Sequence, residues 1–245
     1  MKLVVLGTAG YHPNEHRQTT CVLIPAAGIA FDAGTSFFRL PQYLETDSLD
    51  IFLTHAHLDH TVGLTYLLDV LYQRPLHEVR VHGELEKLAA IRQHLFAKEI
   101  FPVEPPYVDQ PIQTRVAVGN ATVTHCQLEH PGGSLAYRVD WADRSLAFVT
   151  DTTAAPNASY LDFIRDVDLL IHECNFPDGY TELAAKTGHS CLTPVAQLAR
   201  QANVGGLVLL PFNPLIPGLE PRAVEEAHEL FSPIVLAEDG MEIEF

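Results

Sequence analysis

Thr54-His55-Ala56-His57-Leu58-Asp59-His60 sets three imidazoles and one carboxylate within six residues. A predicted buried strand, 50–54, runs into this stretch, and a predicted helix, 62–73, with leucines at helical spacing, follows it. Four polar groups crowded at the end of a buried strand need solvent, hydrogen-bond partners or a metal ion. The stretch therefore indicates a metal site, with a solvated polar loop as the alternative.

The spacing of these side chains suits two metal positions. In an extended or tightly turning loop, His55 and His57 lie on one side and can bind the same ion, whereas Asp59 and His60 point toward a second position. Neutral imidazole and carboxylate are ligands that zinc accepts, and His-rich sites also take manganese or iron. We therefore expect zinc, with manganese or iron as alternatives.

Outward from this stretch, short β-branched runs alternate with helical patterns. Prolines between 102 and 111 indicate a loop with little regular structure, 112–150 is typical of an antiparallel meander, and Asp239-Gly240 indicates a closing hairpin. Strands are expected over 2–6, 20–24, 29–32, 50–54, 79–82, 112–118, 121–127, 134–139, 145–150, 167–173 and 207–210, and helices over 62–73, 84–98, 192–202 and 220–231.

The order of these elements predicts the fold class. Each half of the chain is β-rich first and β/α afterwards, which favours two sheets with helices outside them. The predicted class is α/β (α+β), in a single domain over 1–245, because no linker separates the halves.

Composition narrows the classes of partner. Of 245 residues, 47% are apolar and 19% charged, as in ordinary globular proteins. The chain carries 15 basic and 31 acidic residues and a formal charge of −16. Nucleic acid is disfavoured as a general partner because affinity for it comes from lysine and arginine, and an acidic membrane surface is disfavoured for the same reason.

Four cysteines, at positions 21, 126, 174 and 191, lie far apart and form no C-x-x-C pair. The apolar stretch at the N-terminus is too short for a secretory signal, and no apolar run approaches the ~20 residues of a membrane helix. Reduced thiols in a cytoplasmic protein are expected.

Six motifs along the chain resemble those of one family. The stretch 54–60 resembles the H-x-H-x-D-H signature of the metallo-β-lactamase superfamily. The others are similar to motifs of its ribonuclease Z and phosphodiesterase branch, in the order of that branch: Leu6-Gly7-Thr8-Ala9-Gly10 with Phe31-Asp32-Ala33-Gly34, then His130-Pro131-Gly132, Thr150-Asp151-Thr152, His172-Glu173-Cys174 and Gly188-His189-Ser190. The resemblance implies a four-layer αβ/βα sandwich with the site at one edge of two sheets.

The resemblance also implies a ligand set. In that family His55, His57 and His130 would bind a first metal, Asp59 and His60 a second, and Asp151 both. Two metals roughly 3.5–4 Å apart would hold a hydroxide between them and polarise the scissile group.

Three residues receive catalytic roles by the same resemblance. Asp59 would orient the hydroxide, His189 would donate a proton to a phosphate oxygen or leaving group, and Glu173 would fix the tautomer of His189. Ser190 is expected to cap the helix that follows it.

The sequence departs from the branch at its last histidine. Pro211, in Leu209-Leu210-Pro211-Phe212-Asn213, stands where a ligand histidine is expected, and a proline side chain has no ligand atom. The second metal is therefore expected to bind more weakly, or only one to bind. Alternatively, His189 becomes a ligand, which would remove it from the acid role.

A second departure concerns the substrate. Ribonuclease Z proteins carry a long arm for transfer RNA between two of these motifs, but only 20 residues separate His130 from Asp151. With a charge of −16, transfer RNA is disfavoured, and small phosphodiesters such as cyclic nucleotides fit better.

We expect a metal-dependent hydrolase, a phosphodiesterase that acts on small phosphodiesters through a metal-bound hydroxide. One alternative is a hydrolase of lactones, thioesters or other carboxyl esters, because the same nucleophile attacks either centre. Another is a metal-binding protein that has lost catalysis, which Pro211 alone supports. The family also forms dimers, so a homodimer is an expectation from the resemblance.

Overall fold

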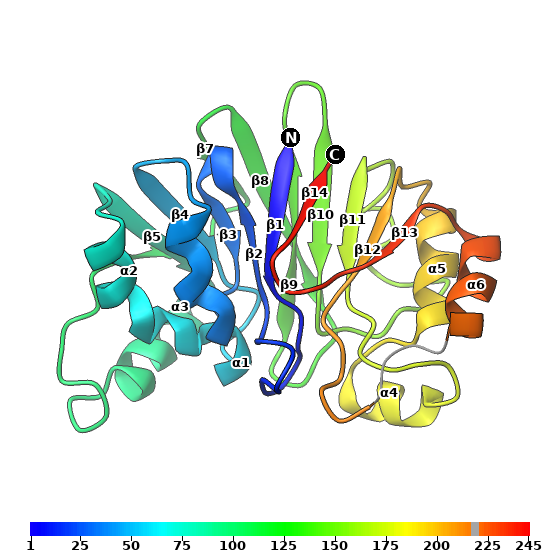
Figure 1. Cartoon of the computed structure of the whole chain (residues 1–245), viewed down its shortest axis with the longest axis horizontal. Helices are drawn as coiled ribbons and strands as arrows, with labels where there is room; N and C mark the ends of the chain where they lie inside the picture. Colours follow the sequence, from blue (N-terminus) through cyan, green and yellow to red (C-terminus); the bar gives the residue numbers. More distant parts are fainter. Residues whose placement is uncertain (217–220) are drawn as a thin grey trace. The chain divides into compact units, whose positions relative to one another are not determined.

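The computed structural model of the chain describes residues 1–216 and 221–245 (Figure 1). Two compact units divide these residues: unit 1 comprises 1–119 and 238–245, and unit 2 comprises 120–237. Glu220, the first residue of the last expected helix, lies outside the described residues. The single domain over 1–245 stays a prediction.

Unit 1 contains a mixed seven-stranded sheet in the order β14-β1-β2-β3-β4-β5-β6. Pairing is antiparallel from β14 to β3 and parallel from β3 to β6. The strands are β1 (Lys2–Gly7), β2 (Cys21–Ile24), β3 (Ile29–Phe31), β4 (Ser48–Phe52), β5 (Glu78–Gly83), β6 (Val108–Pro111) and β14 (Met241–Glu244). β6 corrects the expectation of a loop, since an edge strand tolerates proline.

Helices cover one face of this sheet (Figure 1). They are the 3₁₀ helices η2 (Thr35–Gln42) and η3 (Val62–Tyr66), the α-helices α1 (Leu58–Thr61), α2 (Leu67–Gln73) and α3 (Leu85–Ala90), and the π-helix η4 (Ile91–Leu95). Leu49, Ile51, Val79 and Val81 point from the sheet into the apolar cluster beneath them.

The helix expected over 62–73 is divided into segments. The Gly63 N–H donates to the carbonyl of Ala33 at 2.7 Å, and a Cβ on Gly63 would lie 2.3 Å from the carbonyl oxygen of Gly34. This close backbone approach, which only glycine permits, interrupts the regular helix just after α1. The expected helix 84–98 is also shorter than predicted, because η4 ends at Leu95.

Asp50 lies buried on the opposite face of the unit 1 sheet from Ile51 and contacts two basic side chains. Arg80 donates to its two oxygens from Nε and Nη2 at 2.7 and 2.6 Å, and His82 Nε2 lies 2.7 Å from Oδ1. The His82 ring stacks on Phe52 with 4.4 Å between centroids. Burial alone would raise the pKa of Asp50, but the hydrogen bonds from His82 and Arg80 outweigh it, and the pKa lies below its ordinary value of 3.8.

Replacing Asp50 with asparagine should destabilise unit 1 by about 3 kcal/mol at neutral pH, because the partly buried Arg80 guanidinium loses its counter-ion. Since the folded pKa of Asp50 is lowered, its stabilisation is present above the unfolded pKa and is lost as the pH falls through the folded value. The unfolding free energy of Asp50→Asn, measured in urea, should therefore depend less on pH below about 4 than that of the unmodified chain. The exposed Asp69→Asn is the control, and equal pH dependence of both variants would contradict this account.

Unit 2 contains the second sheet, in the order β13-β12-β11-β10-β9-β8-β7, except for β7, which lies in the residues counted with unit 1. β8, β9 and β10 are antiparallel, as expected of the meander, and β10 to β13 are parallel. The strands are β7 (Arg115–Val118), β8 (Ala121–Leu128), β9 (Ser134–Asp140), β10 (Ser145–Val149), β11 (Leu169–His172), β12 (Leu207–Leu209) and β13 (Ile234–Leu236).

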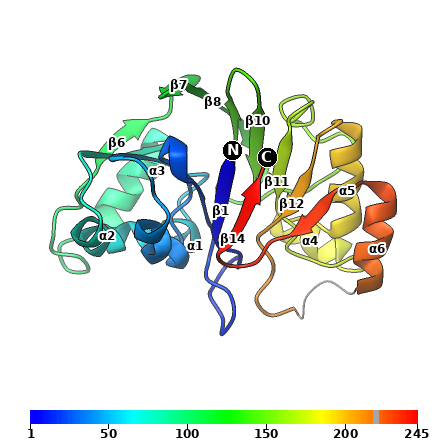
Figure 2. The ribbon, with the colours of Figure 1, turned by 45° about the horizontal axis from the view of Figure 1, so that its top comes forward.

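The helices of unit 2 are α4 (Thr181–Thr187), α5 (Leu192–Gln201) and α6 (Pro221–Leu230). α5 and α6 lie side by side in both ribbon views (Figures 1 and 2) and contact each other. Val195, Leu198 and Ala199 of α5 pack with Leu170 and Leu207 of the sheet in one apolar cluster. α4 was not expected from the sequence. No helix in residues 1–216 and 221–245 has the length and apolar character needed to span a membrane.

The hairpin expected around Asp239-Gly240 is wrong. β13 pairs in parallel with β12, whereas β14 pairs antiparallel with β1, beside which it lies in Figure 2. The Gly240 N–H donates to the Val5 carbonyl at 2.7 Å. Each strand thus completes the open edge of a different sheet, and these long-range pairings leave no local sequence signal.

Candidate functional site

The histidine-rich stretch follows β4 and runs into α1. His57 precedes the first residue of α1, so that Asp59 and His60 lie on its first turn. Nε2 of His55 lies 2.9 Å from Nδ1 of His57. His55 is buried and His57 is exposed, and their ring nitrogens converge at one point of unit 1.

The rings of His55 and His60 each have a hydrogen-bond partner at Nδ1. Nδ1 of His55 lies 2.9 Å from Oγ of Thr54, and Nδ1 of His60 lies 2.7 Å from Oδ2 of Asp32. Nδ1 of His60 donates to the Asp32 carboxylate, so its Nε2 can carry either a second proton or a lone pair that binds a metal. This Nε2 lies 3.3 Å from Oδ2 of Asp59. A proton or a cation can therefore lie between these two atoms.

Asp59 is held in its ionised form. Burial raises its pKa, but the charge and hydrogen bond of His60, together with the N–H of Tyr11, outweigh burial and lower the pKa. The Tyr11 N–H donates to Oδ2 of Asp59 at 2.7 Å. Asp59 is therefore a carboxylate at neutral pH and can bind a cation or accept a proton.

Asp32 is a functional residue that sequence reasoning missed. It directly follows β3, is fully buried and has a φ of 58°. Besides His60, it accepts the N–H of Thr54 at 2.8 Å and its hydroxyl at 3.0 Å. Burial raises its pKa, although His60 and Thr54 act in the opposite direction. The aspartate of Phe31-Asp32-Ala33-Gly34 was the available signal, and only the fold reveals its partner.

Replacing Asp32 with asparagine should weaken metal binding about 10–100-fold, the usual effect of losing a group that orients a ligand histidine. The amide of asparagine can donate to Nδ1 of His60, which moves the proton to Nε2 and removes the lone pair. Zinc affinity measured by competition with a chromogenic chelator checks this. Asp69→Asn is the matched control, and unchanged affinity in Asp32→Asn would show that Asp32 does not orient His60.

Unit 2 brings together three more of the predicted site residues. His130 follows β8, and Asp151 follows β10. Ligand atoms of His130, Asp151 and His189 all lie within 4.8 Å of one another. Three such atoms at this spacing could hold a metal ion.

Hydrogen bonds fix the orientation of two members of this group. Nδ1 of His130 donates to the Gly188 carbonyl at 3.1 Å, and its Nε2 lies 3.5 Å from Oδ1 of Asp151. The Thr150 hydroxyl donates to Oδ2 of Asp151 at 2.6 Å. Here too, a proton or a cation can lie between the imidazole nitrogen and the carboxylate oxygen.

The backbone and the neighbouring side chains at position 188 require a glycine. Its φ is 75°, and a Cβ on it would lie 2.8 Å from Cδ of Pro131 and 3.0 Å from Nδ1 of His130. A side chain would therefore displace His130 as well as strain the backbone. The glycine of the Gly188-His189-Ser190 motif keeps the two histidines close, with 5.3 Å between their ring centroids.

Glu173 is fully buried directly after β11 and holds His189. It accepts the N–H of Thr152 at 2.7 Å and the N–H of Ser190 at 3.0 Å, and Nδ1 of His189 lies 3.2 Å from each of its oxygens. With its Nδ1 proton donated to Glu173, His189 presents Nε2, which can bind a metal or carry a second proton.

The expected cap at Ser190 is wrong. The first residue of α5 follows Cys191, whose side chain makes no capping hydrogen bond, and Asp178 accepts the N–H of Thr193 in the first turn at 3.0 Å. The Ser190 hydroxyl instead donates to the Thr152 carbonyl at 2.7 Å and accepts the N–H of Ala154 at 2.8 Å. Ser190 thereby ties the segment after Asp151 to the segment of His189.

Pro211 lies just beyond β12, as the sequence indicates for the missing histidine. Its carbonyl accepts the N–H of Cys174 at 3.3 Å. His172 does not replace the missing ligand, because its Nδ1 donates to the Glu173 carbonyl and its Nε2 lies 2.8 Å from the Tyr160 hydroxyl. His228 is exposed on α6.

The predicted site residues thus form two groups, each described within its own unit. His55, His57, Asp59 and His60 lie together in unit 1, and His130, Asp151, Glu173 and His189 lie together in unit 2. Each group brings imidazole nitrogens and carboxylate oxygens together, and such donors could hold a metal ion.

Comparison with known proteins agrees with these motifs. A family model described as "Beta-lactamase superfamily domain" matches residues 28–210. A ribonuclease Z of Haloarcula marismortui is 24% identical over 303 positions, which cover 99% of this chain and 96% of that protein. The crystal structure of the metallo-beta-lactamase fold protein YhfI from Bacillus subtilis superposes with a TM-score of 0.82 at 23% identity, over 99% of both chains. A diphosphatase from the PhnP family superposes with a TM-score of 0.74 at 19% identity, over 100% of this chain and 97% of its own.

These similarities confirm the predicted fold class, an α/β fold of metallo-β-lactamase type. The alignment with the Haloarcula protein is longer than this chain, 303 positions against 245 residues, so at least 58 positions of that relative stand opposite gaps in this chain.

Proposed function

The chain belongs to the metallo-β-lactamase superfamily, in its ribonuclease Z-like branch, and on this basis we propose that it is a metal-dependent phosphodiesterase of small phosphodiesters. One observation carries the proposal: the Nε2 atoms of His60 and His130 each lie within 3.5 Å of a carboxylate oxygen, that of Asp59 and that of Asp151. Either a proton or a metal ion can lie between the two atoms of each pair, and imidazole with carboxylate is a usual ligand set of a metal site.

We assign the ligands by the motifs of the family. His55, His57 and His130 would hold a first metal, Asp59 and His60 a second, and Asp151 both. Zinc suits this set of imidazoles and carboxylates, with manganese or iron as alternatives. When bound, the metal would polarise the phosphoryl group and lower the pKa of water to about 7.

The remaining chemistry belongs to the side chains. Asp59, ionised at neutral pH, would orient the attacking hydroxide. His189 would give a proton from Nε2 to the departing oxygen while Nδ1 stays hydrogen-bonded to Glu173. The buried Glu173 carboxylate stabilises the imidazolium that this requires.

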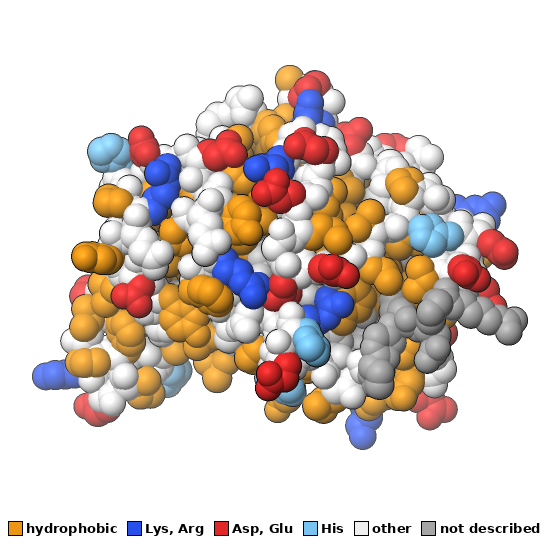
Figure 3. Space-filling view, in the orientation of Figure 1, with side chains coloured by type: hydrophobic (Ala, Val, Ile, Leu, Met, Phe, Trp, Pro, Cys, Tyr) orange, Lys and Arg blue, Asp and Glu red, His pale blue; other side chains and the backbone are white. Residues whose placement is uncertain are grey.

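Small substrates are favoured over transfer RNA by length and charge. At least 58 positions of a ribonuclease Z relative have no counterpart here, which agrees with the short segment between His130 and Asp151. On the face drawn in Figure 3, basic side chains lie singly among acidic ones. Binding of a long phosphate backbone needs clustered lysine and arginine.

Ribonuclease action is the second candidate, because several relatives are named ribonuclease Z. The test compares zinc-loaded protein on bis(p-nitrophenyl) phosphate, 2′,3′-cyclic nucleotides, a transfer RNA precursor, a lactone and a thioester. Our proposal predicts turnover of the small phosphodiesters only. Cleavage confined to the RNA would favour the second candidate, and activity confined to the lactone or thioester would contradict both.

A further inference from the structure

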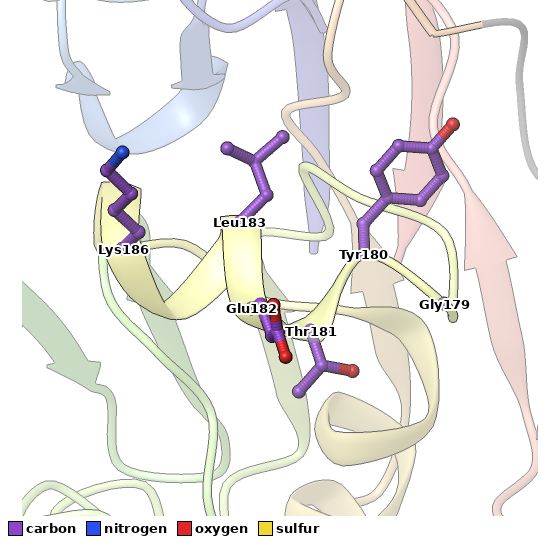
Figure 4. A pocket seen from close by; sticks show the side chains of 6 residues that line it. All are labelled: Gly179, Tyr180, Thr181, Glu182, Leu183 and Lys186. Carbon is purple, nitrogen blue, oxygen red and sulfur yellow. The ribbon is translucent and has the colours of Figure 1, made fainter.

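α4 carries an exposed face that the proposed chemistry does not use. Tyr180, Leu183 and Lys186 project to the same side of this helix, whereas Glu182 and Thr181 project to the other side (Figure 4). We call these three residues the α4 face. With Gly179, Thr181 and Glu182 they line a hollow of about 500 Å³ in unit 2.

The α4 face lies close to His189 within unit 2. Gly188 ends α4, and the His189 N–H donates to the carbonyl of Ala184 at 2.9 Å. The Phe176 ring joins the two, with its centroid 6.2 Å from that of His189 and 6.0 Å from that of Tyr180. Only the Phe176 ring thus separates the Tyr180 ring from that of His189, and one nucleotide can span this separation.

Two members of the α4 face suit a planar apolar group. Tyr180 and Leu183 are each 43% exposed, although both are large and apolar. The Tyr180 ring lies within 19° of parallel to Phe176, and this stack holds it in place. A fixed, exposed aromatic ring is the usual platform for a nucleobase.

The third member suits an anion. Nine lysine and arginine side chains in residues 1–216 and 221–245 form ion pairs with carboxylates. Lys186 forms none among those residues and is exposed. In a chain of charge −16, a cation left unneutralised three residues before His189 attracts an anionic ligand.

We propose that the α4 face binds the base and a second phosphate of a nucleotide whose scissile phosphate lies at His189. Tyr180 and Leu183 contact the base, and Lys186 pairs with the phosphate that is not cleaved. This inference rests on the proposed phosphodiesterase function and narrows its substrates to nucleotides with more than one phosphate group.

Calorimetric titration of the full zinc-loaded chain tests the anion contact. Adenosine 3′,5′-bisphosphate should bind at least about tenfold more tightly than inorganic phosphate, since base stacking adds to affinity. Lys186→Gln should weaken the bisphosphate about fivefold, reduce the salt dependence of its binding and leave inorganic phosphate unchanged. Lys98→Gln removes the same charge from an exposed position in unit 1 and should change nothing.

The aromatic contact has its own matched pair of variants. Tyr180→Leu should weaken both adenosine 5′-monophosphate and the bisphosphate about fivefold or more and leave phosphate unchanged. Tyr72→Leu alters a tyrosine that is 89% exposed on α2 and serves as its control. Thermal unfolding of each variant shows whether α4 keeps its structure, and Tyr180→Phe, which keeps the ring, should restore binding.

The proposal is overturned if the bisphosphate binds no more tightly than inorganic phosphate. It is also overturned if Lys186→Gln and Lys98→Gln have equal effects on bisphosphate binding. The outcome is separate from that of the proposed function. If nucleotides bind as expected and no phosphodiester is hydrolysed, the phosphodiesterase is wrong and the α4 face stands. If phosphodiesters are hydrolysed and the Tyr180 and Lys186 variants change nothing, the α4 face is wrong.

Discussion

Replacing His57 with alanine should lower phosphodiester hydrolysis by at least about a thousandfold, because the first metal loses one of three imidazoles and with it the activation of water. The imidazole is exposed, and the His57 backbone carbonyl, not its side chain, accepts the Thr61 hydroxyl at 2.9 Å. The free energy of unfolding should therefore stay within about 0.5 kcal/mol of the unmodified chain. Initial rates on bis(p-nitrophenyl) phosphate and urea denaturation measure the two quantities.

His77→Ala is the matched control, since His77 is also exposed in unit 1 and its backbone N–H alone bonds to the Asp47 carbonyl. It should keep full activity. Substantial hydrolysis by His57→Ala would remove the stretch 54–60 from the catalytic machinery.

Replacing His189 with glutamine should lower kcat about 10²–10⁴-fold on substrates with an alkoxide leaving group, the usual range for losing a general acid. Glutamine can still donate to Glu173, and the N–H groups of Thr152 and Ser190 keep that buried carboxylate solvated. A p-nitrophenolate leaves without a proton, so the same variant should lose far less activity on bis(p-nitrophenyl) phosphate. The measurement is the ratio of the two losses.

The metal content of His189→Gln separates the two roles open to this histidine. If His189 is a general acid, replacing it with glutamine leaves the metal content unchanged. Loss of metal together with equal activity losses on both substrates would show that His189 is a ligand, in the position that Pro211 leaves without a donor.

Sequence alone could single out most residues of the candidate site because they follow strands. Asp32, His130, Asp151 and Glu173 come within two residues of a strand end, and apolar strands are the clearest elements in this sequence. Asp32 shows where that reasoning stops. Its residue type and motif are visible, but its hydrogen bond to His60 spans 28 residues and exists only in the fold.

The fold was predictable where the pattern was local. In the meander β7–β10, short strands follow one another closely and are joined by turns. By contrast, β13 and β14 are neighbours in sequence but pair with β12 and β1, which lie far apart in sequence. The division of the helix after α1 depends on Gly63 meeting the backbone of Ala33 and Gly34. α4 has too few buried positions for a helical period to mark it, since only Ala184 is buried in it.

Elemental analysis of the chain purified without chelator tests the central claim most directly. Imidazole nitrogens lie beside carboxylate oxygens at His60–Asp59 and at His130–Asp151, as they do in metal sites, so we predict at least one ion of zinc, manganese or iron per chain. The metal should be lost from His57→Ala and retained by His77→Ala. A chain that contains none of these metals, and takes up none when they are supplied, would contradict the account.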